Sequence, residues 1–236
     1  MDIVKSLFIR TKRAYNAFLA RETDPYSTPS YSQEGEDLVL KRIFPSKLDG
    51  FYVDVGAHHP RRFSNTYLFY MRGWRGINID ATPGSMSEFK KERPRDVNIE
   101  CAISDKEEQI DFYLFEEKAL NTFSKDLSDS YVAGGYKLQA RQQLTTRRLD
   151  SILEQFVNQQ IDFMSIDVEG FEMQVLLSND WTKYRPKVLV LEYLRSDISS
   201  QLINSKLVTF LVEKKYCLIG KTANTLFFKD ISFDLG

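Results

Sequence analysis

The chain has 236 residues, of which 42% are hydrophobic and 28% are charged, a composition that suits one large soluble domain or one domain with a terminal appendage. Its formal net charge of −1 provides no global field that would attract nucleic acid, and no apolar run approaches the ~18–20 residues that span a bilayer. The two cysteines, Cys101 and Cys217, are isolated and no signal peptide is visible, which argues against a disulfide framework or a zinc cluster and makes the cytoplasm the expected location.

The first 30 residues predict a basic amphipathic helix over 1–22, followed by a linker rich in Pro, Ser and Thr. Such a helix suits contact with anionic lipid at the inner membrane face, packing on the domain, or contact between two copies in a homodimer, and these three roles stay open. A second domain is expected over 31–236, opening with a helix at 33–43 for which Ser32 is the predicted N-cap.

From residue 51 onward, predicted strands and helices alternate, which implies a mostly parallel sheet that is covered by helices on both faces. Two strands joined by a tight turn at the C-terminus imply an antiparallel hairpin at one edge. The predicted strands are 51–55, 76–80, 97–102, 108–115, a segment within 161–170, 187–193, 216–220 and 225–229, and the predicted helices are 64–72, 84–92, one from 149, 170–178 and 198–214.

Acidic residues stand at most of the predicted strand ends. In an open parallel sheet, ligands bind beyond the carboxyl ends of the strands. Carboxylates at these ends suit a ligand that carries hydroxyl groups and positive charge, and they suit a polyphosphate badly. Five predicted strands, namely 51–55, 76–80, 97–102, the one within 161–170, and 187–193, are considered for this cleft. Four of their ends are acidic, at Asp54, Asp80, Asp167 with Glu169, and Glu192, whereas the other end carries Ala102, Ile103 and Ser104.

The turn after the first strand discriminates between cofactors. Dinucleotide-binding folds use G-x-G-x-x-G, but the run from Gly56 is G-A-H-H-P-R, with one glycine and with Pro60 lacking an amide donor. Asp80 ends the next strand, where nucleotide-binding sheets place the acid that accepts hydrogen bonds from ribose, although it could also cap the following turn. No Walker lysine motif is present. These features disfavour NAD and ATP and favour S-adenosylmethionine.

His58 and His59 are the only histidines. Two adjacent residues rarely bind the same metal ion, and no second His or Cys cluster accompanies them, so a zinc site is disfavoured. A neutral imidazole titrates near physiological pH, so one of the two could act as a general base, and we take His59 as that candidate. The alternative is that both histidines shape the loop and line the cofactor pocket.

The motif "SIDVEG" places Asp167 and Glu169 on one side of an extended segment, two residues apart. Two such carboxylates could bind Mg²⁺ or Ca²⁺ through oxygen, or they could orient a substrate hydroxyl or the sulfonium side chain. Helix capping would explain Asp167 alone but not both acids. Glu192 ends the next strand and is expected to face the same cleft.

Five segments together resemble the FkbM family of S-adenosylmethionine-dependent methyltransferases, and they occur in the family's order between about residues 31 and 193. The resemblance implies an α/β, Rossmann-like class I methyltransferase fold with a seven-stranded sheet and a reversed last strand. It also implies methylation of hydroxyl groups on secondary metabolites, sugars or polysaccharide units. The segments are "YSQEGEDLVL", "GFYVDVGAHHP", "SNTYLFYMRGWRGINIDATP", "RPRDVNIECAIS" and "FMSIDVEGFEMQVL".

The resemblance further implies a set of cofactor-binding positions in the first turn, on the ribose and beside the adenine. Two segments, 33–36 and 64–66, also resemble parts of the family's cofactor pocket. The implied cofactor residues are Gln33, Glu36, Asp54, Gly56, Ala57, Asn65, Asp80, Ala102, Ile103, Ser104 and Asp167.

We therefore expect an O-methyltransferase that acts on a hydroxyl of a sugar or polysaccharide unit. The protein must align the acceptor oxygen with the C–S bond and remove its proton, and Asp167, Glu169 and His59 are the candidates for this work. A Mg²⁺ ion held by Asp167, Glu169 and Glu192 would lower the pKa of the hydroxyl instead. The region 117–145 lies outside the resemblance and is expected to shape the acceptor site.

Two other classes of function remain open at this point. One is an NAD-dependent sugar-modifying enzyme, which the missing glycines disfavour. The other is a non-catalytic binding protein on the same fold, which the acids at four strand ends disfavour.

Overall fold

A computed structural model describes residues 26–194 and 205–234. The chain divides into two compact units, Met1–Ser30 and Tyr31–Gly236. The helix predicted over 1–22 lies outside the described residues, as does the first part of the helix predicted over 198–214. Among the helices that are described, none has the length and apolarity required of a bilayer span.

A seven-stranded sheet forms the centre of the larger unit, with the order β3-β2-β1-β7-β8-β10-β9. The first five of these strands pair in parallel, whereas β10 runs antiparallel to both β8 and β9. This is the predicted Rossmann-like sheet with a reversed last strand. The strands are β1 (Phe51–Val55), β2 (Arg75–Asp80), β3 (Val97–Glu100), β7 (Phe163–Ile166), β8 (Val188–Glu192), β9 (Tyr216–Lys221) and β10 (Thr225–Asp230).

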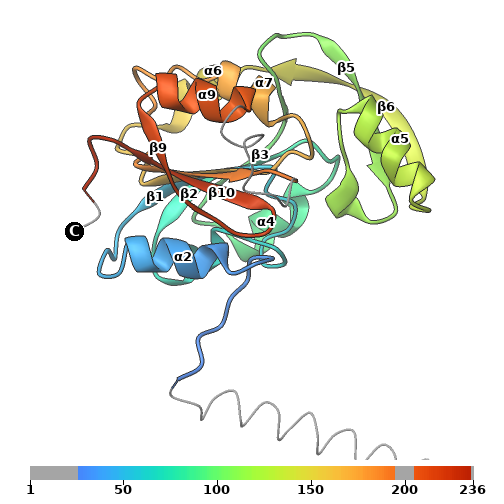
Figure 1. The fold of residues 1–236 in the computed structure, drawn as a ribbon. Helices are drawn as coiled ribbons and strands as arrows, with labels where there is room; N and C mark the ends of the chain where they lie inside the picture. Colours follow the sequence, from blue (N-terminus) through green and yellow to red (C-terminus); the bar gives the residue numbers. More distant parts are fainter. Residues whose placement is uncertain (1–25, 195–204, 235–236) are drawn as a thin grey trace, which may run out of the picture. The chain divides into compact units, whose positions relative to one another are not determined.

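Helices cover both faces of this sheet, as predicted (Figure 1). Side chains alternate along β1, so that Val53 and Val55 join one apolar cluster and Tyr52 joins the other. Strands buried on both faces need apolar residues at consecutive positions, which explains the near-continuous apolar runs in the sequence. One face carries α6 (Leu149–Phe156), α7 (Glu172–Leu177) and α9 (Lys206–Glu213), and the other carries α2 (Glu36–Ile43), α3 (Tyr67–Met71) and α4 (Met86–Glu92).

An insertion between β3 and α6 forms a second, three-stranded sheet with the order β4-β6-β5 (Figure 1). The strand at 108–115 was predicted, but its partner β6 and the intervening helix were not. The predicted strand at 97–102 is two strands, because the Cys101 amide bonds to Asp80 O at 2.9 Å and the chain then leaves β2 for β6. The elements are β4 (Ala102–Ile103), β5 (Gln109–Phe115), η1 (Lys118–Leu120), α5 (Lys125–Ala133) and β6 (Leu138–Arg147).

The helix predicted at 33–43 begins later than expected, at Glu36, with Gly35 as its N-cap. Ser32 is therefore not the N-cap, although its hydroxyl accepts a hydrogen bond from the Asp37 amide at 3.3 Å. The carboxylate of Glu34 accepts hydrogen bonds from the amide and the side chain of Asn224, at 2.9 and 3.0 Å. This contact with the β9–β10 turn holds the preceding residues outside the helix.

Candidate cofactor cleft

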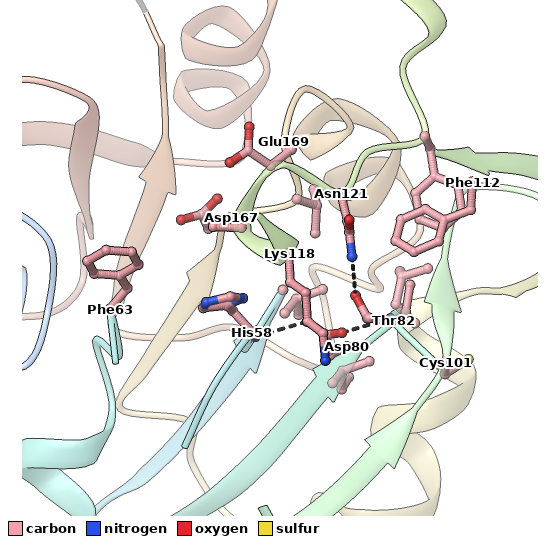
Figure 2. A pocket seen from close by; sticks show the side chains of 18 of the residues that line it. His58, Phe63, Asp80, Thr82, Cys101, Phe112, Lys118, Asn121, Asp167 and Glu169 are labelled. Carbon is pink, nitrogen blue, oxygen red and sulfur yellow. Dashed lines mark hydrogen bonds between the residues drawn. The ribbon is translucent and has the colours of Figure 1, made fainter. Parts of the chain in front are cut away.

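A cleft of about 740 Å³ opens at the carboxyl ends of β1, β2 and β7 (Figure 2). One end of it is apolar, and two of its aromatic rings, Phe112 and Phe123, lie 4.4 Å apart between centroids. The two rings come from β5 and from the segment between η1 and α5, whereas the rest of the apolar wall comes from β2, β4 and the segment between β3 and β4. This wall consists of Ile79, Cys101, Ile103, Phe112 and Phe123.

Asp80 lies next along the cleft, at the end of β2. Its Oδ1 accepts a hydrogen bond from the Thr82 amide at 2.7 Å, and its Oδ2 accepts one from the His58 amide at 2.9 Å (Figure 2). Asp80 therefore caps the turn, which was the alternative role considered for it. A carboxylate oxygen can accept a second hydrogen bond, so this capping leaves Asp80 able to accept a diol.

Gly56 is required where the turn after β1 meets the turn after β7. Its φ angle is +86°, and a Cβ atom added at Gly56 would lie 1.6 Å from the carbonyl oxygen of Asp167. The Asp167 amide in turn donates to Val55 O at 2.9 Å. Only glycine allows this close approach, which brings the two predicted motifs together at one wall of the cleft.

Asp167, Glu169 and Glu192 form an acidic cluster, with a carboxylate oxygen of each within 4.8 Å of the others. Asp167 and Glu169 line the cleft, and Glu192, which is 9% exposed, has a buried Oε2 atom without a hydrogen-bond partner among the described residues. No lysine or arginine in the described part of the chain forms an ion pair with these acids. The structure thus brings together all three residues that were predicted to bind a metal.

Burial raises the pKa of every acid in this cluster. It raises the pKa of Glu169 to about 7, assisted by the charge of Glu172. Burial, followed by the charges of Asp167 and Glu169, raises the pKa of Glu192 to about 12, and the pKa of Asp167 is also well above its ordinary value. Adding a positive charge here would stabilise the ionised carboxylates.

Backbone strain is concentrated at the cleft. Among the described residues, four that are not glycine have a left-handed φ, and three of them line the cleft: His58 (54°), Phe63 (57°) and Glu169 (52°). Each such residue costs on the order of 1–3 kcal/mol and persists where its surroundings fix it. Strain of this kind is typical of a functional site.

The two histidines occupy different places. His58 lines the cleft, its ring stacks on Phe63 at 6.2 Å between centroids, and burial lowers its pKa. His59 lies outside the cleft wall: its Nδ1 accepts hydrogen bonds from the amides of Arg61 and Arg62, both at 3.0 Å, and its Nε2 lies 3.3 Å from Glu88 Oε2. The structure therefore does not bring the predicted base His59 to the cofactor cleft.

Asp54 is also set back from the cleft. The register pairs Asp54 with Asn78, which lies two residues before Asp80. Asp54 therefore lies further from the carboxyl edge of the sheet than Asp80 does. Asp54 accepts a hydrogen bond from Thr66 Oγ1 at 2.8 Å, which fixes the start of α3. Burial raises the pKa of Asp54 to about 6, and the charge of Arg93 opposes that rise.

Of the other predicted cofactor residues, Gln33, Gly56, Asp80, Ile103 and Asp167 line the cleft. Glu36 instead accepts a hydrogen bond from Thr225 Oγ1 at 2.9 Å, and Asn65 donates one to Ser165 Oγ at 2.9 Å. Three more are buried and do not line the cleft, namely Ala57, Ala102 and Ser104.

The insertion supplies cleft residues that the sequence did not reveal, among them Phe112, Lys118, Asn121 and Phe123. Asn121 Nδ2 donates to Thr82 Oγ1 at 3.1 Å, so the insertion is bonded to the turn after β2 (Figure 2). Alternating apolar residues at 108–115 indicated a strand, but nothing local indicated where it would pack.

The chain matches one family model and several solved structures. Residues 54–213 match the model of the methyltransferase FkbM domain. A comparison with curated proteins finds no match. Among solved structures, the chain is similar to a putative RNA methyltransferase from Pyrococcus horikoshii, at 8% identity and a TM-score of 0.43, with 90% of this chain and 95% of that chain covered.

Two further solved structures are similar at comparable levels. One is an O-methyltransferase from Bacillus cereus in complex with SAH, at 10% identity and a TM-score of 0.40, with 92% of this chain and 88% of that chain covered. The other is a precorrin-6y C5,15-methyltransferase from Geobacter metallireducens, at 10% identity and a TM-score of 0.38, with 82% and 84% covered.

The family match extends over more than half of the chain, from β1 through α9, and it includes the turns that carry Gly56, Asp80 and Asp167. It agrees with the resemblance found in the sequence motifs, and it does not support the alternative of an NAD-dependent enzyme. The chain belongs to the FkbM family of S-adenosylmethionine-dependent methyltransferases.

Proposed function

We propose that this protein transfers the methyl group of S-adenosylmethionine to a hydroxyl of a sugar or polysaccharide unit. The observation that carries the proposal is the order of side chains along the cleft. The apolar wall with Phe112 and Phe123 suits adenine, Asp80 suits the ribose diol, and the cluster at Asp167 and Glu169 suits the positively charged methionine end.

A second cavity supports a polyhydroxylated acceptor. It adjoins the cleft, and His58, Thr82 and Lys118 line both. Its other walls carry charges of both signs and hydroxyl groups, which favour hydrogen bonding to a sugar over the binding of an apolar or a strongly anionic molecule. These wall residues include His59, Arg62, Ser85, Ser87, Glu88, Glu116 and Glu117.

In the transfer step, the bond from sulfur to the methyl carbon breaks as the bond from the acceptor oxygen forms. S-adenosylhomocysteine leaves with a neutral sulfur, and the proton of the hydroxyl passes to a carboxylate of the cleft, Asp167 or Glu169. The sulfonium charge already activates the methyl group, so the protein's work is alignment and proton removal. Asp167 and Glu169 line the cleft at the end that we assign to the methionine part of the cofactor, and they can accept hydrogen bonds from the acceptor hydroxyl.

A divalent cation at Asp167, Glu169 and Glu192 is a second proposal. The three carboxylates offer oxygen ligands within 4.8 Å of one another, and the unpartnered Oε2 of Glu192 adds a buried donor atom that a cation would satisfy. A bound Mg²⁺ would lower the pKa of the acceptor hydroxyl. The positive charges of the cofactor are the competing explanation for the same cluster.

Calorimetry with S-adenosylhomocysteine tests the cofactor assignment. Asp80→Asn should weaken binding about 10-fold or more, because the variant loses a charge-assisted hydrogen bond to the ribose. Asp129→Asn is the matched control, since this carboxylate is 62% exposed on α5 and its affinity should stay unchanged. Equal affinity of Asp80→Asn and the native protein would show that the ribose lies elsewhere.

The acceptor and the metal are tested in one assay. The protein is incubated with S-adenosylmethionine carrying a deuterated methyl group and a panel of methyl glycosides, oligosaccharides and nucleotide sugars, and mass spectrometry detects the gain of the label. Repeating the positive reactions after treatment with a chelator, with and without added Mg²⁺, tests the cation. Turnover that survives thorough chelation would eliminate the metal proposal and leave the methyltransferase proposal intact.

A further inference from the structure

Glu169 is held by the insertion through both its backbone and its side chain. Thr122 Oγ1 donates a hydrogen bond to the Glu169 carbonyl oxygen at 2.6 Å, and Tyr131 Oη donates one to Glu169 Oε2 at 2.5 Å. Thr122 precedes α5 and Tyr131 lies within it, so both contacts come from the segment between β5 and β6. Glu169 itself lies in the cofactor cleft (Figure 2).

These contacts act on a strained loop. Glu169 has a φ angle of 52° and the next residue, Gly170, has one of 88°, so two consecutive residues are left-handed. A Cβ atom added at Gly170 would lie 3.4 Å from Leu127, and Phe171 packs on Phe123 at 5.4 Å between ring centroids. The insertion thus packs along the loop and stabilises the left-handed backbone conformation of Glu169, which would otherwise relax.

Tyr131 is itself fixed in place. Its ring makes edge contacts with Phe115 at 5.7 Å and with Tyr136 at 6.0 Å between centroids. Its hydroxyl is the donor and the carboxylate is the acceptor in the hydrogen bond to Glu169. A neutral donor fixes the direction of one carboxylate oxygen and leaves the negative charge of Glu169 in place.

We propose that Tyr131 and Thr122 are positioning residues for methyl transfer, which hold the Glu169 carboxylate toward the methyl-bearing sulfonium and the acceptor oxygen. This inference rests on the proposed function, because it requires the methionine end of the cofactor to lie at Asp167 and Glu169. It gives the insertion a role in the chemistry of transfer as well as in the shape of the acceptor site.

The test compares two cofactor analogues and needs no acceptor. S-adenosylhomocysteine carries a neutral sulfur where the methyl group is lost, whereas sinefungin carries an ammonium group at the position of the methyl. The ratio of their dissociation constants, measured by calorimetry, therefore reports how well the protein stabilises positive charge at the transferred methyl. Merely structural damage would weaken both analogues together and leave the ratio unchanged.

We expect Tyr131→Phe to lower the preference for sinefungin about 5- to 10-fold, which corresponds to about 1–1.4 kcal/mol, the usual net contribution of one hydrogen bond. Glu169→Gln should lower it at least as much, and the double variant should show no further loss, since Tyr131 acts through Glu169. Thr122→Val should change the ratio in the same direction. Tyr136→Phe is the matched control, since its ring touches Tyr131 and its side chain is exposed, and it should match the native ratio.

Three outcomes would overturn the inference: an unchanged ratio in Tyr131→Phe, an unchanged ratio in Glu169→Gln, or additive losses in the double variant. The failure of the proposed function is distinguishable from these, because in that case the native protein would bind neither analogue. Tyr131→Phe keeps the ring and its contacts, so a folded variant is expected, and its melting temperature provides the check.

Discussion

In the described part of the chain, the group around Arg93 and the acids of the cleft are both buried, and they differ in how their charges are balanced. Beneath the sheet, the side chains of Arg93 and Asp96 are both fully buried, and Arg93 Nε donates to Asp96 Oδ2 at 2.9 Å. At the cleft, Asp167, Glu169 and Glu192 gather with Glu172 nearby, and no cation of the described chain joins them. The Arg93 group has its counter-charge within the protein, whereas the cleft group is made of acids alone.

The Arg93 group has a partner for most of its polar atoms. Arg93 Nη2 donates to Tyr52 Oη at 2.8 Å, and the carboxylate of Asp96 accepts hydrogen bonds from Tyr52 Oη at 2.8 Å and from the Gly76 amide at 2.9 Å. The guanidinium also lies over the ring of Tyr70, 5.3 Å from its centroid. A buried ion pair with this many partners fixes the geometry of the elements that it joins, here β1, β2 and the segment after α4.

The Arg93 group stabilises the fold, whereas the acids of the cleft are suited to binding a positively charged ligand. Burying a carboxylate without a counter-charge raises its pKa and destabilises the fold, so a cluster of such groups at an open cleft needs a compensating reason. The cationic methionine end of the cofactor, or a metal ion, supplies the missing positive charge only when it binds. The contrast leads to three predictions, each of which alters one of the two groups.

Removing Arg93 should have the largest effect. Arg93→Met keeps much of the apolar stem but leaves Asp96 buried without a cation, so we expect a loss of about 3–5 kcal/mol in the free energy of unfolding, measured with urea. Lys183→Met is the control, because this lysine pairs with Glu154 at the surface with side chains 52% and 69% exposed. Its loss should stay below about 1 kcal/mol. Similar losses in the two variants would refute the structural role given to Arg93.

The pH dependence of stability should reveal the raised pKa values of the acidic cluster and of Asp54. The pKa values of Asp54, Glu169 and Glu192 are raised to about 6, 7 and 12, above the ordinary values of 3.8 for Asp and 4.5 for Glu. The folded protein therefore holds protons that the unfolded chain releases, so stability is greatest below the unfolded pKa and falls as pH rises toward the folded value.

Between pH 5 and pH 8 we expect the free energy of unfolding to fall on the order of 3 kcal/mol, measured by urea titration at each pH. Saturating sinefungin should flatten the decline, because a bound cation stabilises the ionised carboxylates. A stability that rises over this range would show that the cluster is already compensated within the protein.

The sequence revealed more of the fold than of the site. The alternation of apolar runs with helical periods predicted the parallel sheet and its reversed last strand, because those patterns depend on burial within each element. The ends of β2 and β7 were also predictable, and Asp80 and Asp167 line the cleft as expected. Strand ends are local features, and the sheet brings parallel ends to one edge.

Long-range features escaped the sequence. Asp54 looked equivalent to Asp80 until the register of β1 with β2 placed it two residues further back. His58 and His59 are neighbours in sequence, and a left-handed φ at His58 decides which of them lines the cleft. Tyr131 and Thr122 reach Glu169 only because β6 pairs with β5 and folds the insertion back over the loop.

The third prediction has the smallest effect, but it tests the difference between the two groups most directly. Replacing a buried carboxylate by its amide should raise the free energy of unfolding in the acidic cluster and lower it in the Arg93 group. Glu192→Gln removes a carboxylate whose burial raises its pKa to about 12, so at pH 8 we expect a gain of about 1–2 kcal/mol in the free energy of unfolding. Asp96→Asn removes the charge that balances Arg93, and it should instead lose stability at the same pH. At pH 4.5 the gain in Glu192→Gln should nearly vanish, since this pH equals the ordinary pKa of Glu and half of the unfolded chains keep the carboxyl protonated. A loss of stability in both variants would mean that Glu192, like Asp96, is paired within the protein, and the acidic cluster would then have no need of a cation from the cofactor.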